Sequence, residues 1–277
     1  MPVKILHREK NLMRFYHKEK IDNKRNIYLL GHKVFSYTKS SNVGITPIYD
    51  DENTIFRTSF WNKEQEALVN LAKNKDYSAL ITHLFNQDSE FDANTGGGGD
   101  SLYFDEYFEN RVGMQMIYDE IVQNHTDKEI LDLGCGNCAL LDKLSQANLK
   151  VKGIDASAFR VLNHQKNHNF VYFALAEHIP LDDESIDIVI SQEVLEHVFD
   201  IEQTLSEMHR ILRKNGICFI QVPYKNLCES VNHLRLFSKE SLSNLVAKRF
   251  EILSCELVPY LLGEKNNNIY LKAKKVA

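Results

Sequence analysis

The pattern of apolar positions separates the chain into two parts. From about residue 101, short β-branched runs alternate with stretches whose apolar residues recur every three or four positions. The first pattern is typical of buried strands and the second of amphipathic helices. Seven strands are expected over residues 129–133, 151–154, 169–173, 186–190, 216–222, 250–257 and 269–273. Strands that alternate with helices predict an α/β fold, with a mostly parallel sheet covered by helices on both faces.

Helical spacing also precedes the first of these strands, over residues 101–124. The same spacing between the strands predicts helices over residues 139–145, 159–164, 201–212 and 239–247. The expected architecture is therefore a doubly wound, Rossmann-like sheet of seven strands. Such sheets bind their ligands outside the carboxyl ends of the strands.

The first hundred residues have a different sequence pattern. Two β-rich runs, residues 26–30 and 33–37, flank Gly31-His32 and predict a hairpin, while residues 54–86 show helical spacing. Four consecutive glycines at positions 96–99 maximise backbone freedom and predict a flexible linker. We therefore expect an accessory region over residues 1–100 and the main domain over residues 101–277.

Charge is distributed unevenly along the chain. Residues 1–40 carry ten basic and three acidic residues, a balance of +7, so the remainder holds −12 of the total of −5. A basic arm can attract an anionic partner or be a solvated surface, whereas an acidic body argues against wrapping a nucleic acid. The sequence has no apolar run long enough for membrane insertion, no secretory signal, and five cysteines without paired spacing. These features predict a cytoplasmic protein.

A glycine bend after the first strand of the main domain suggests a binding site for a nucleoside. Gly134 and Gly136 remove side chains where the chain must turn, and Asp155, at the end of the next strand, can accept hydrogen bonds from ribose hydroxyls. Together with Ala139, the glycines also match a dinucleotide fingerprint. Asp132 decides between the two, because a carboxylate beside the bend would repel a pyrophosphate but attract the ammonium and sulfonium of S-adenosylmethionine.

Four ordered segments resemble the motifs of class I S-adenosylmethionine-dependent methyltransferases. The resemblance covers roughly residues 101–275. The matching segments are residues 132–136, 151–157, 176–189 and 191–198. It implies that the last strand runs antiparallel and that the cofactor contacts Asp132, Gly134, Cys135, Gly136, Asp155, Ala156, Ala176, Glu177, Ser191 and Gln192.

Two positions depart from the family pattern. Cys138 stands where the family often has a third glycine, and Leu175 stands where an aspartate commonly reaches the adenine amino group. Adenine recognition is then expected from backbone groups near Ala176 and from Glu177. Cys135 and Cys138 have a C-x-x-C spacing, but they lack a second ligand pair, so we expect packing rather than zinc binding.

Transfer to a hydroxyl group needs a base close to the acceptor. Glu193, Glu196 and His197 follow the strand that delivers the cofactor, and His233 follows the next strand. We take Glu193, His197 and His233 as the catalytic candidates. Together with Glu196, these three residues also resemble the metal ligands of some small-RNA and quinone-pathway O-methyltransferases. The same sequence pattern, however, occurs widely without a metal. A divalent metal is therefore allowed by the sequence but not expected.

The acceptor is predicted from a weaker resemblance. Residues 24–39 resemble a short segment at the start of bacterial surface-polysaccharide enzymes. This favours O-methylation of a sugar or other component of a capsule or lipopolysaccharide. A quinone precursor or other small metabolite is the alternative acceptor, and a non-catalytic cofactor-binding subunit and a nicotinamide-dependent oxidoreductase are the alternative protein classes. We expect a small-molecule or glycan partner and no nucleic acid, and the sequence is compatible with a homo-oligomer.

Overall fold

The structure, a computed structural model, describes residues 16–21, 24–29, 32–38, 56–57, 63–84, 108–157, 160–161, 170–225 and 233–276. Its contacts divide the chain into two compact units, Met1–Thr46 and Pro47–Ala277. The predicted linker at residues 96–99 lies outside the described residues, and the predicted domain boundary near residue 100 stays a prediction. Within the described residues, no helix is both long enough and apolar enough to cross a membrane.

The first unit contains an antiparallel sheet of strands β1 (Tyr16–Ile21), β2 (Lys24–Leu29) and β3 (His32–Thr38). The hairpin expected from the sequence is confirmed by the pairing of β2 with β3. Gly31, expected in its turn, lies outside the described residues. Strand β1 was not expected, because three of its six residues are Lys or Glu and hide the alternation that marks a strand.

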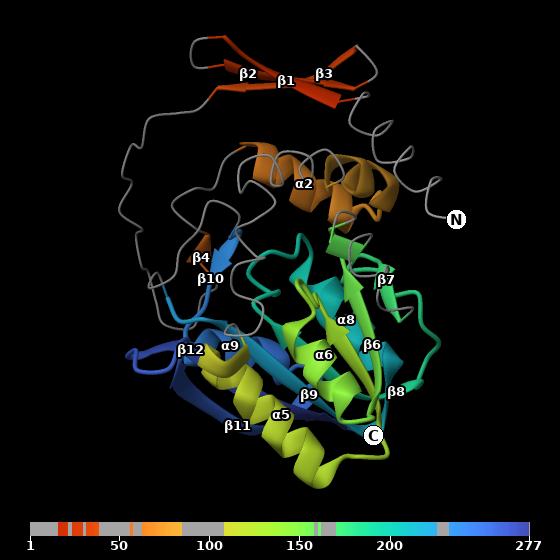
Figure 1. The fold of residues 1–277 in the computed structure, drawn as a ribbon, viewed down its shortest axis with the longest axis vertical. Coiled ribbons are helices and arrows are strands. Elements are labelled where there is room, and N and C mark those ends of the chain that lie inside the picture. The colour runs from red at the N-terminus through yellow and green to blue at the C-terminus, as the bar shows by residue number, and fades with distance from the viewer. Residues whose placement is uncertain are drawn as a thin grey trace, which may run out of the picture. The chain divides into compact units, whose positions relative to one another are not determined.

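The second unit is built around the predicted seven-stranded sheet, in the order β11-β12-β9-β8-β5-β6-β7 (Figure 1). Strand β12 runs antiparallel to both neighbours, and the other pairings are parallel. The strands are β5 (Glu129–Leu133), β6 (Lys150–Asp155), β7 (Val171–Phe173), β8 (Ile186–Gln192), β9 (Leu212–Pro223), β11 (Phe250–Pro259) and β12 (Asn266–Lys275). The fold class and the reversed last strand are therefore confirmed.

Four helices follow the predicted pattern closely, α5 (Val112–Asn124), α6 (Ala139–Gln146), α8 (Ile201–Ile211) and α9 (Lys239–Val246). Helix α5 starts later than predicted, because the backbone at Arg111 is extended and bridges to Leu261. The side chain of Asp200 caps α8, and a Ser238–Ser241 capping box starts α9. Of the helix predicted over residues 159–164, the structure describes residues 160–161 only, and both are helical.

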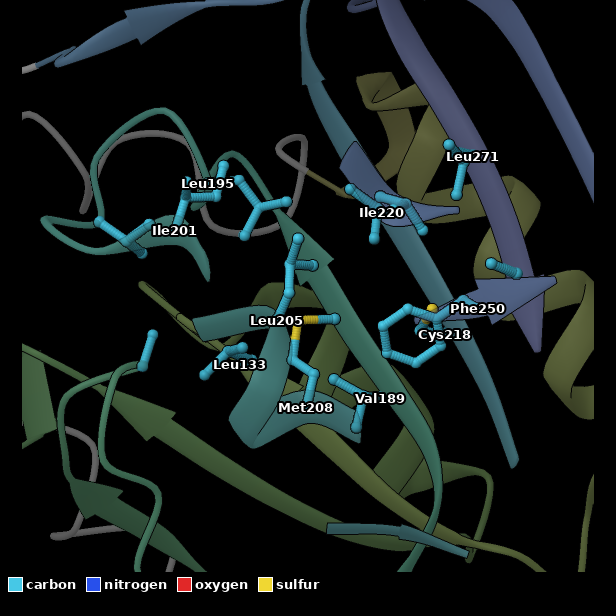
Figure 2. Packing of buried hydrophobic residues seen from close by; sticks show 14 of the residues in the cluster. Leu133, Val189, Leu195, Ile201, Leu205, Met208, Cys218, Ile220, Phe250 and Leu271 are labelled. Carbon is cyan, nitrogen blue, oxygen red and sulfur yellow. The ribbon is translucent and has the colours of Figure 1, made fainter. Parts of the chain in front are cut away.

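Two apolar clusters cover the faces of the sheet. One packs α8 and α9 against it, and Figure 2 shows Leu205 and Met208 lying against Val189 and Cys218. The other contains Ile117 of α5 and residues of α6. Burying both sheet faces explains why the strands read as continuous apolar runs rather than as alternating ones. These clusters hold the strand ends, and the loops that follow them, in fixed positions.

Strand β5 lies between β6 and β8, so successive parallel strands extend to opposite sides of it. This is the topological switch point, where open α/β sheets bind ligands beyond the strand ends. A helical pair, α2 (Lys63–Lys73) and residues 77–84, packs Leu68 and Leu80 against Leu175, which follows β7. The short strand β4 (Phe56–Arg57) pairs with β10 (Arg235–Leu236). Part of the sequence before residue 101 thus contributes directly to the unit that holds the sheet.

Candidate active site

A tight bend joins β5 to α6 and holds two glycines at positive φ. Gly134 has φ +74°, and a Cβ atom there would lie 2.4 Å from Cγ2 of Val194, so only glycine fits. Gly136 has φ +52°. The N–H groups of Gly134 and Cys135 both donate to the Ile154 carbonyl, at 2.8 and 3.0 Å, which ties the bend to β6. The bend therefore presents backbone without side chains at the switch point.

Cys138, at the position of the family's third glycine, adopts the left-handed conformation itself, with φ 61°. Its Sγ lies 3.8 Å from the Sγ of Cys135, and both side chains belong to the apolar cluster beneath α5 and α6. The hydrogen bond from Cys138, together with burial, raises the pKa of the Cys135 thiol. A protonated, buried thiol pair is suited to packing rather than to metal binding.

Two carboxylates flank the bend, as the sequence predicts. Asp155, at the end of β6, accepts hydrogen bonds from the N–H groups of Gly136 and Ser157, each at 2.8 Å. Asp132 lies within β5 and is 5% exposed. Burial, with smaller contributions from Cys138 and Asp155, raises the pKa of Asp132 to about 8. A cation beside Asp132 would lower the free energy needed to ionise this buried carboxyl group, whereas a diphosphate would raise it.

The side chain of Glu177 holds the loop after β7 in place. Its carboxylate Oε1 accepts hydrogen bonds from the backbone N–H groups of Phe199 and Asp200, at 2.6 and 3.1 Å. Burial raises the pKa of Glu177, and these hydrogen bonds oppose the shift. The side chain thus braces the turn before α8, and its contact with adenine stays a prediction, as does that of the neighbouring Ala176.

Tyr77, which the sequence did not single out, also lies at this loop. Its ring stacks on His178 with centroids 5.2 Å apart and planes 12° apart, and its hydroxyl donates to the Glu177 carbonyl at 3.3 Å. Leu175, at the position of the family's aspartate, is 3% exposed beneath the helical pair that carries Tyr77. The accessory helices therefore brace the loop at which adenine contacts are expected.

The segment after β8 places polar side chains at the switch point. Ser191 is fully buried, and the amide Nε2 of Gln192 donates to Oε1 of Gln221 at 2.8 Å. Glu193, which is half-buried, has φ +55°, an unfavourable conformation for a residue with a side chain. Its carboxylate Oε1 accepts from Asn268 at 2.7 Å, and burial raises its pKa to about 7.

The structure brings Glu196, His197 and His233 together, although 36 positions separate the two histidines. One ligand atom from each of the three side chains lies within 4.8 Å of the other two. The histidine ring centroids are 4.7 Å apart, and Nε2 of His197 lies 3.8 Å from Oε1 of Glu196. Burial raises the pKa of Glu196 well above its usual value and lowers that of His233 to about 4.

Two arginines near this group are buried and have structural contacts. Arg235 donates to the carbonyls of Leu195 and Val198, so its charge stabilises the turn that carries Glu196. Arg111 lies 3.5 Å above the ring centroid of Tyr260, and its charge opposes the upward pKa shift of nearby Glu193.

Comparisons with known proteins agree with this arrangement. Residues 131–220 match the family model described as a methyltransferase domain. That match contains the bend, both acids and the segment after β8. Residues 131–220 form a methyltransferase domain.

Two curated relatives resemble this methyltransferase domain. A probable S-adenosylmethionine-dependent methyltransferase of Mycolicibacterium smegmatis is 29% identical over 112 residues, which is 39% of this chain and 43% of the relative. A ubiquinone biosynthesis O-methyltransferase of Pelagibacter ubique is 33% identical over 104 residues, 36% of this chain and 43% of the relative. The chain therefore spans less than half the length of either relative.

A solved structure shares the fold of the methyltransferase domain. It is the 1,6-didemethyltoxoflavin-N1-methyltransferase of Burkholderia thailandensis, bound to 1,6-didemethyltoxoflavin and S-adenosylhomocysteine. The TM-score is 0.57 at 16% identity, and the match covers 84% of this chain and all of that chain. At this identity the likeness shows the fold alone.

The group of Glu196, His197 and His233 suits a divalent cation in its chemistry. Glu196 is 1% exposed, and neither of its carboxylate oxygens has a hydrogen-bond partner among the described residues. A buried carboxylate without partners is costly, and a cation held by oxygen and imidazole ligands would remove that cost. The sequence allowed a metal without expecting one, and the three side chains could hold one.

Two further polar residues beside the site were missed by the sequence reasoning. Gln221 and Asn268 are 1% and 0% exposed, and they lie at the same edge of the sheet as Gln192. A signal was present, because Gln221 interrupts the apolar run of residues 217–222 close to the end of β9. A buried amide at the carboxyl end of a strand would have been a reason to include it.

Proposed function

We propose that this protein transfers a methyl group from S-adenosylmethionine to a hydroxyl oxygen of a small-molecule or glycan acceptor. The single observation that carries the proposal is the bend at Gly134 and Gly136, flanked by the carboxylates of Asp132 and Asp155. When bound, S-adenosylmethionine supplies an electrophilic methyl group on a positively charged sulfur. Asp155 would accept hydrogen bonds from the ribose, and Asp132 would face the ammonium group.

Methyl transfer to oxygen requires a base for the acceptor proton. Glu193 is our candidate, because Asn268 holds its carboxylate and its strained backbone places it at the end of the strand beside the cofactor bend. In the proposed step, a bond forms between the acceptor oxygen and the methyl carbon while the sulfur–methyl bond breaks. The acceptor's O–H proton passes to Glu193, and S-adenosylhomocysteine leaves as a neutral thioether.

Glu196, His197 and His233 would hold a divalent cation in this proposal, so the two histidines change from candidate bases to candidate ligands. A cation there would lower the pKa of an acceptor hydroxyl and help to orient it. The buried carboxylate of Glu196, which has no hydrogen-bond partner among the described residues, is the observation that supports this assignment.

A sugar of a surface polysaccharide is our first candidate acceptor, proposed from the resemblance of residues 24–39 alone. A quinone precursor is the second candidate. It is supported by the ubiquinone biosynthesis O-methyltransferases among the relatives, including one from Hydrogenovibrio crunogenus that is 29% identical over 133 residues. The geometry of the site favours a hydroxyl acceptor in both cases.

Incubation with labelled S-adenosylmethionine and a panel of acceptors tests the proposal. The panel contains nucleotide-sugars, glycan fragments and dihydroxybenzoates, and mass spectrometry locates the added methyl group. We expect the labelled methyl group on a hydroxyl oxygen of one acceptor class. The Glu193→Gln variant should give no labelled product. Label found only on nitrogen, or a cofactor that binds without any transfer, would contradict the proposed reaction.

A further inference from the structure

Three buried amides occupy one face of the sheet at the edge that carries the site. Gln192 pairs in register with Gln221, and Gln221 pairs with Tyr270, so these side chains point to the same face. Asn268 lies two residues from Tyr270 on β12 and therefore shares that face. Gln221 and Asn268 are diagonal neighbours across an antiparallel pair, a separation that long side chains can span.

On this face, the strands change from apolar to polar as they approach the edge. Strand β8 carries Ile188 and Ile190 before Gln192, and β9 carries Phe219 before Gln221. The apolar members pack under α5, in the same cluster as its Ile117. Replacing the last apolar position of each strand by a buried amide costs free energy unless the amide is fully hydrogen-bonded.

The amides are only partly hydrogen-bonded. Gln221 accepts from Gln192 and Asn268 donates to Glu193, but Nε2 of Gln221 and Oδ1 of Asn268 have no hydrogen-bond partner in the described part of the chain. Each such atom has lost its hydrogen bonds to water without gaining a replacement. An unused donor and an unused acceptor therefore lie on two adjacent strands, both next to the proposed base.

Helix α5 leaves room for one of these amides. A Cβ atom on Gly113 would lie 1.8 Å from Oε1 of Gln221 and 2.8 Å from its Nε2, so any side chain at position 113 would displace the amide. Glu193, which is only partly buried, accepts from Asn268, so the two buried amides lie beside a side chain that retains some exposure. The group lies on the β8 side of the cofactor bend, away from Asp155 on β6.

We infer that Gln221 and Asn268, next to Glu193, form a subsite for neighbouring hydroxyl groups of the methyl acceptor. One hydroxyl accepts from Nε2 of Gln221, and a second donates to Oδ1 of Asn268. A hydroxyl group can do either, whereas an alkyl or unsubstituted aromatic surface would leave both atoms unpaired. The inference rests on the proposed function and names its substrate class, an acceptor with adjacent hydroxyls, as in a sugar ring or a catechol.

Saturation-transfer NMR on the full chain, saturated with S-adenosylhomocysteine, tests this subsite. The probes form matched pairs, catechol against phenol and methyl α-mannopyranoside against cyclohexanol. We expect a dihydroxy probe of at least one pair to bind about tenfold more tightly than its monohydroxy partner. The pair that shows the difference identifies the source of the diol as aromatic or sugar.

Substitutions that keep the side-chain volume show which residues cause the preference for the dihydroxy probe. Gln221→Met and Asn268→Leu should each remove the preference for the diol, and Tyr270→Phe, which lies opposite Gln221 on the same face and keeps both amides, should retain it. Thermal unfolding and calorimetric affinity for S-adenosylhomocysteine show whether each variant is folded. If one variant fails to fold, the other still tests the subsite.

Equal binding of both members of each pair, or a preference that survives in a folded Gln221→Met or Asn268→Leu protein, would overturn the subsite. Failure of the wild-type chain to bind S-adenosylhomocysteine would instead overturn the proposed function, so the two failures are distinguishable.

Discussion

The two sides of the switch point are built differently. On the β5–β6 side, the bend and its two acids lie within 24 positions of one another, from Asp132 to Asp155, and backbone hydrogen bonds fix them. On the β8–β9–β12 side, Glu193 follows β8, Gln221 lies on β9 and Asn268 lies on β12. The Glu193 carboxylate accepts from the Asn268 side chain, and the Glu193 N–H donates to the Gln221 carbonyl. The first side depends on backbone geometry, and the second depends on the packing of the whole sheet.

If the first side depends on backbone geometry, Gly134→Ala should have the largest effect. The new Cβ would meet Val194 at 2.4 Å at positive φ, and we expect a loss of about 3 kcal/mol or more in the free energy of unfolding. Gly263→Ala is the matched control, because its φ is +88° with no atom within 4 Å, so it should cost about 1 kcal/mol. Urea denaturation measures both, and equal losses would show that the clash is absent.

Asp155→Ala should weaken binding of S-adenosylhomocysteine by about a hundredfold, because two charge-assisted hydrogen bonds to the ribose would be lost. Asp187→Ala is the control. Asp187 accepts from the Glu129 N–H at 2.9 Å and from Arg213 at 2.6 Å, at the opposite end of the sheet. It should lower stability and leave the affinity unchanged. Calorimetry that found the same affinity in both variants would exclude Asp155 from the ribose site.

The ionisation of Asp132 is expected to lower stability as pH rises, although the ionised carboxylate is the form that binds the cofactor. Its pKa is about 8 in the folded chain and 3.8 in the reference state, so between these values the folded state binds more protons. Stability therefore falls as pH rises from about 4 to 8 and is constant above that range.

Asp132→Asn should remove this dependence. At pH 8 we expect the variant without cofactor to be more stable than wild type by about 1 to 3 kcal/mol, and at pH 4 nearly equal to it. The same variant should bind S-adenosylhomocysteine more weakly. Thermal unfolding across this pH range measures the first effect, and a variant less stable than wild type at pH 8 would show that the carboxylate has a partner.

The smallest effect concerns the second side of the site. Adding Mg²⁺ or Mn²⁺ after exhaustive chelation should raise the unfolding temperature of wild type by a few degrees, as binding to the folded state requires. Glu196→Gln should abolish the rise, and Glu207→Gln, which removes a carboxylate bonded to Arg210 on α8, should retain it. A rise that persists in Glu196→Gln would place the cation elsewhere.

The contrast between the two sides also explains how far the sequence could predict the structure. The strands follow from apolar runs, and Gly134, Gly136 and Asp155 lie close enough in sequence to be recognised as one motif. Glu196 and His197 could be grouped with His233 only through a family resemblance, since the two histidines are 36 positions apart. Asn268 could not be found in this way, because its place beside Glu193 depends on β12 running antiparallel next to β9.

Tyr77 marks a different limit of sequence reasoning. Its helical spacing predicts a helix but does not say which surface the helix covers, and the structure places its ring on His178. The role of Arg235 was also hidden, because whether an arginine is exposed or bonded to carbonyls depends on the turn that surrounds it. Contacts between distant segments, rather than local patterns, decide both.

Calorimetric titration of the wild-type chain with S-adenosylhomocysteine, repeated in excess NADH, tests the central claim most directly. At pH 9, where the Asp132 carboxyl with its pKa of about 8 is ionised, the account predicts saturable binding to one site with an affinity that NADH does not change, because the carboxylate repels a diphosphate beside the bend. Binding of NADH that displaces S-adenosylhomocysteine, or no binding of the sulfur nucleoside at all, would contradict it.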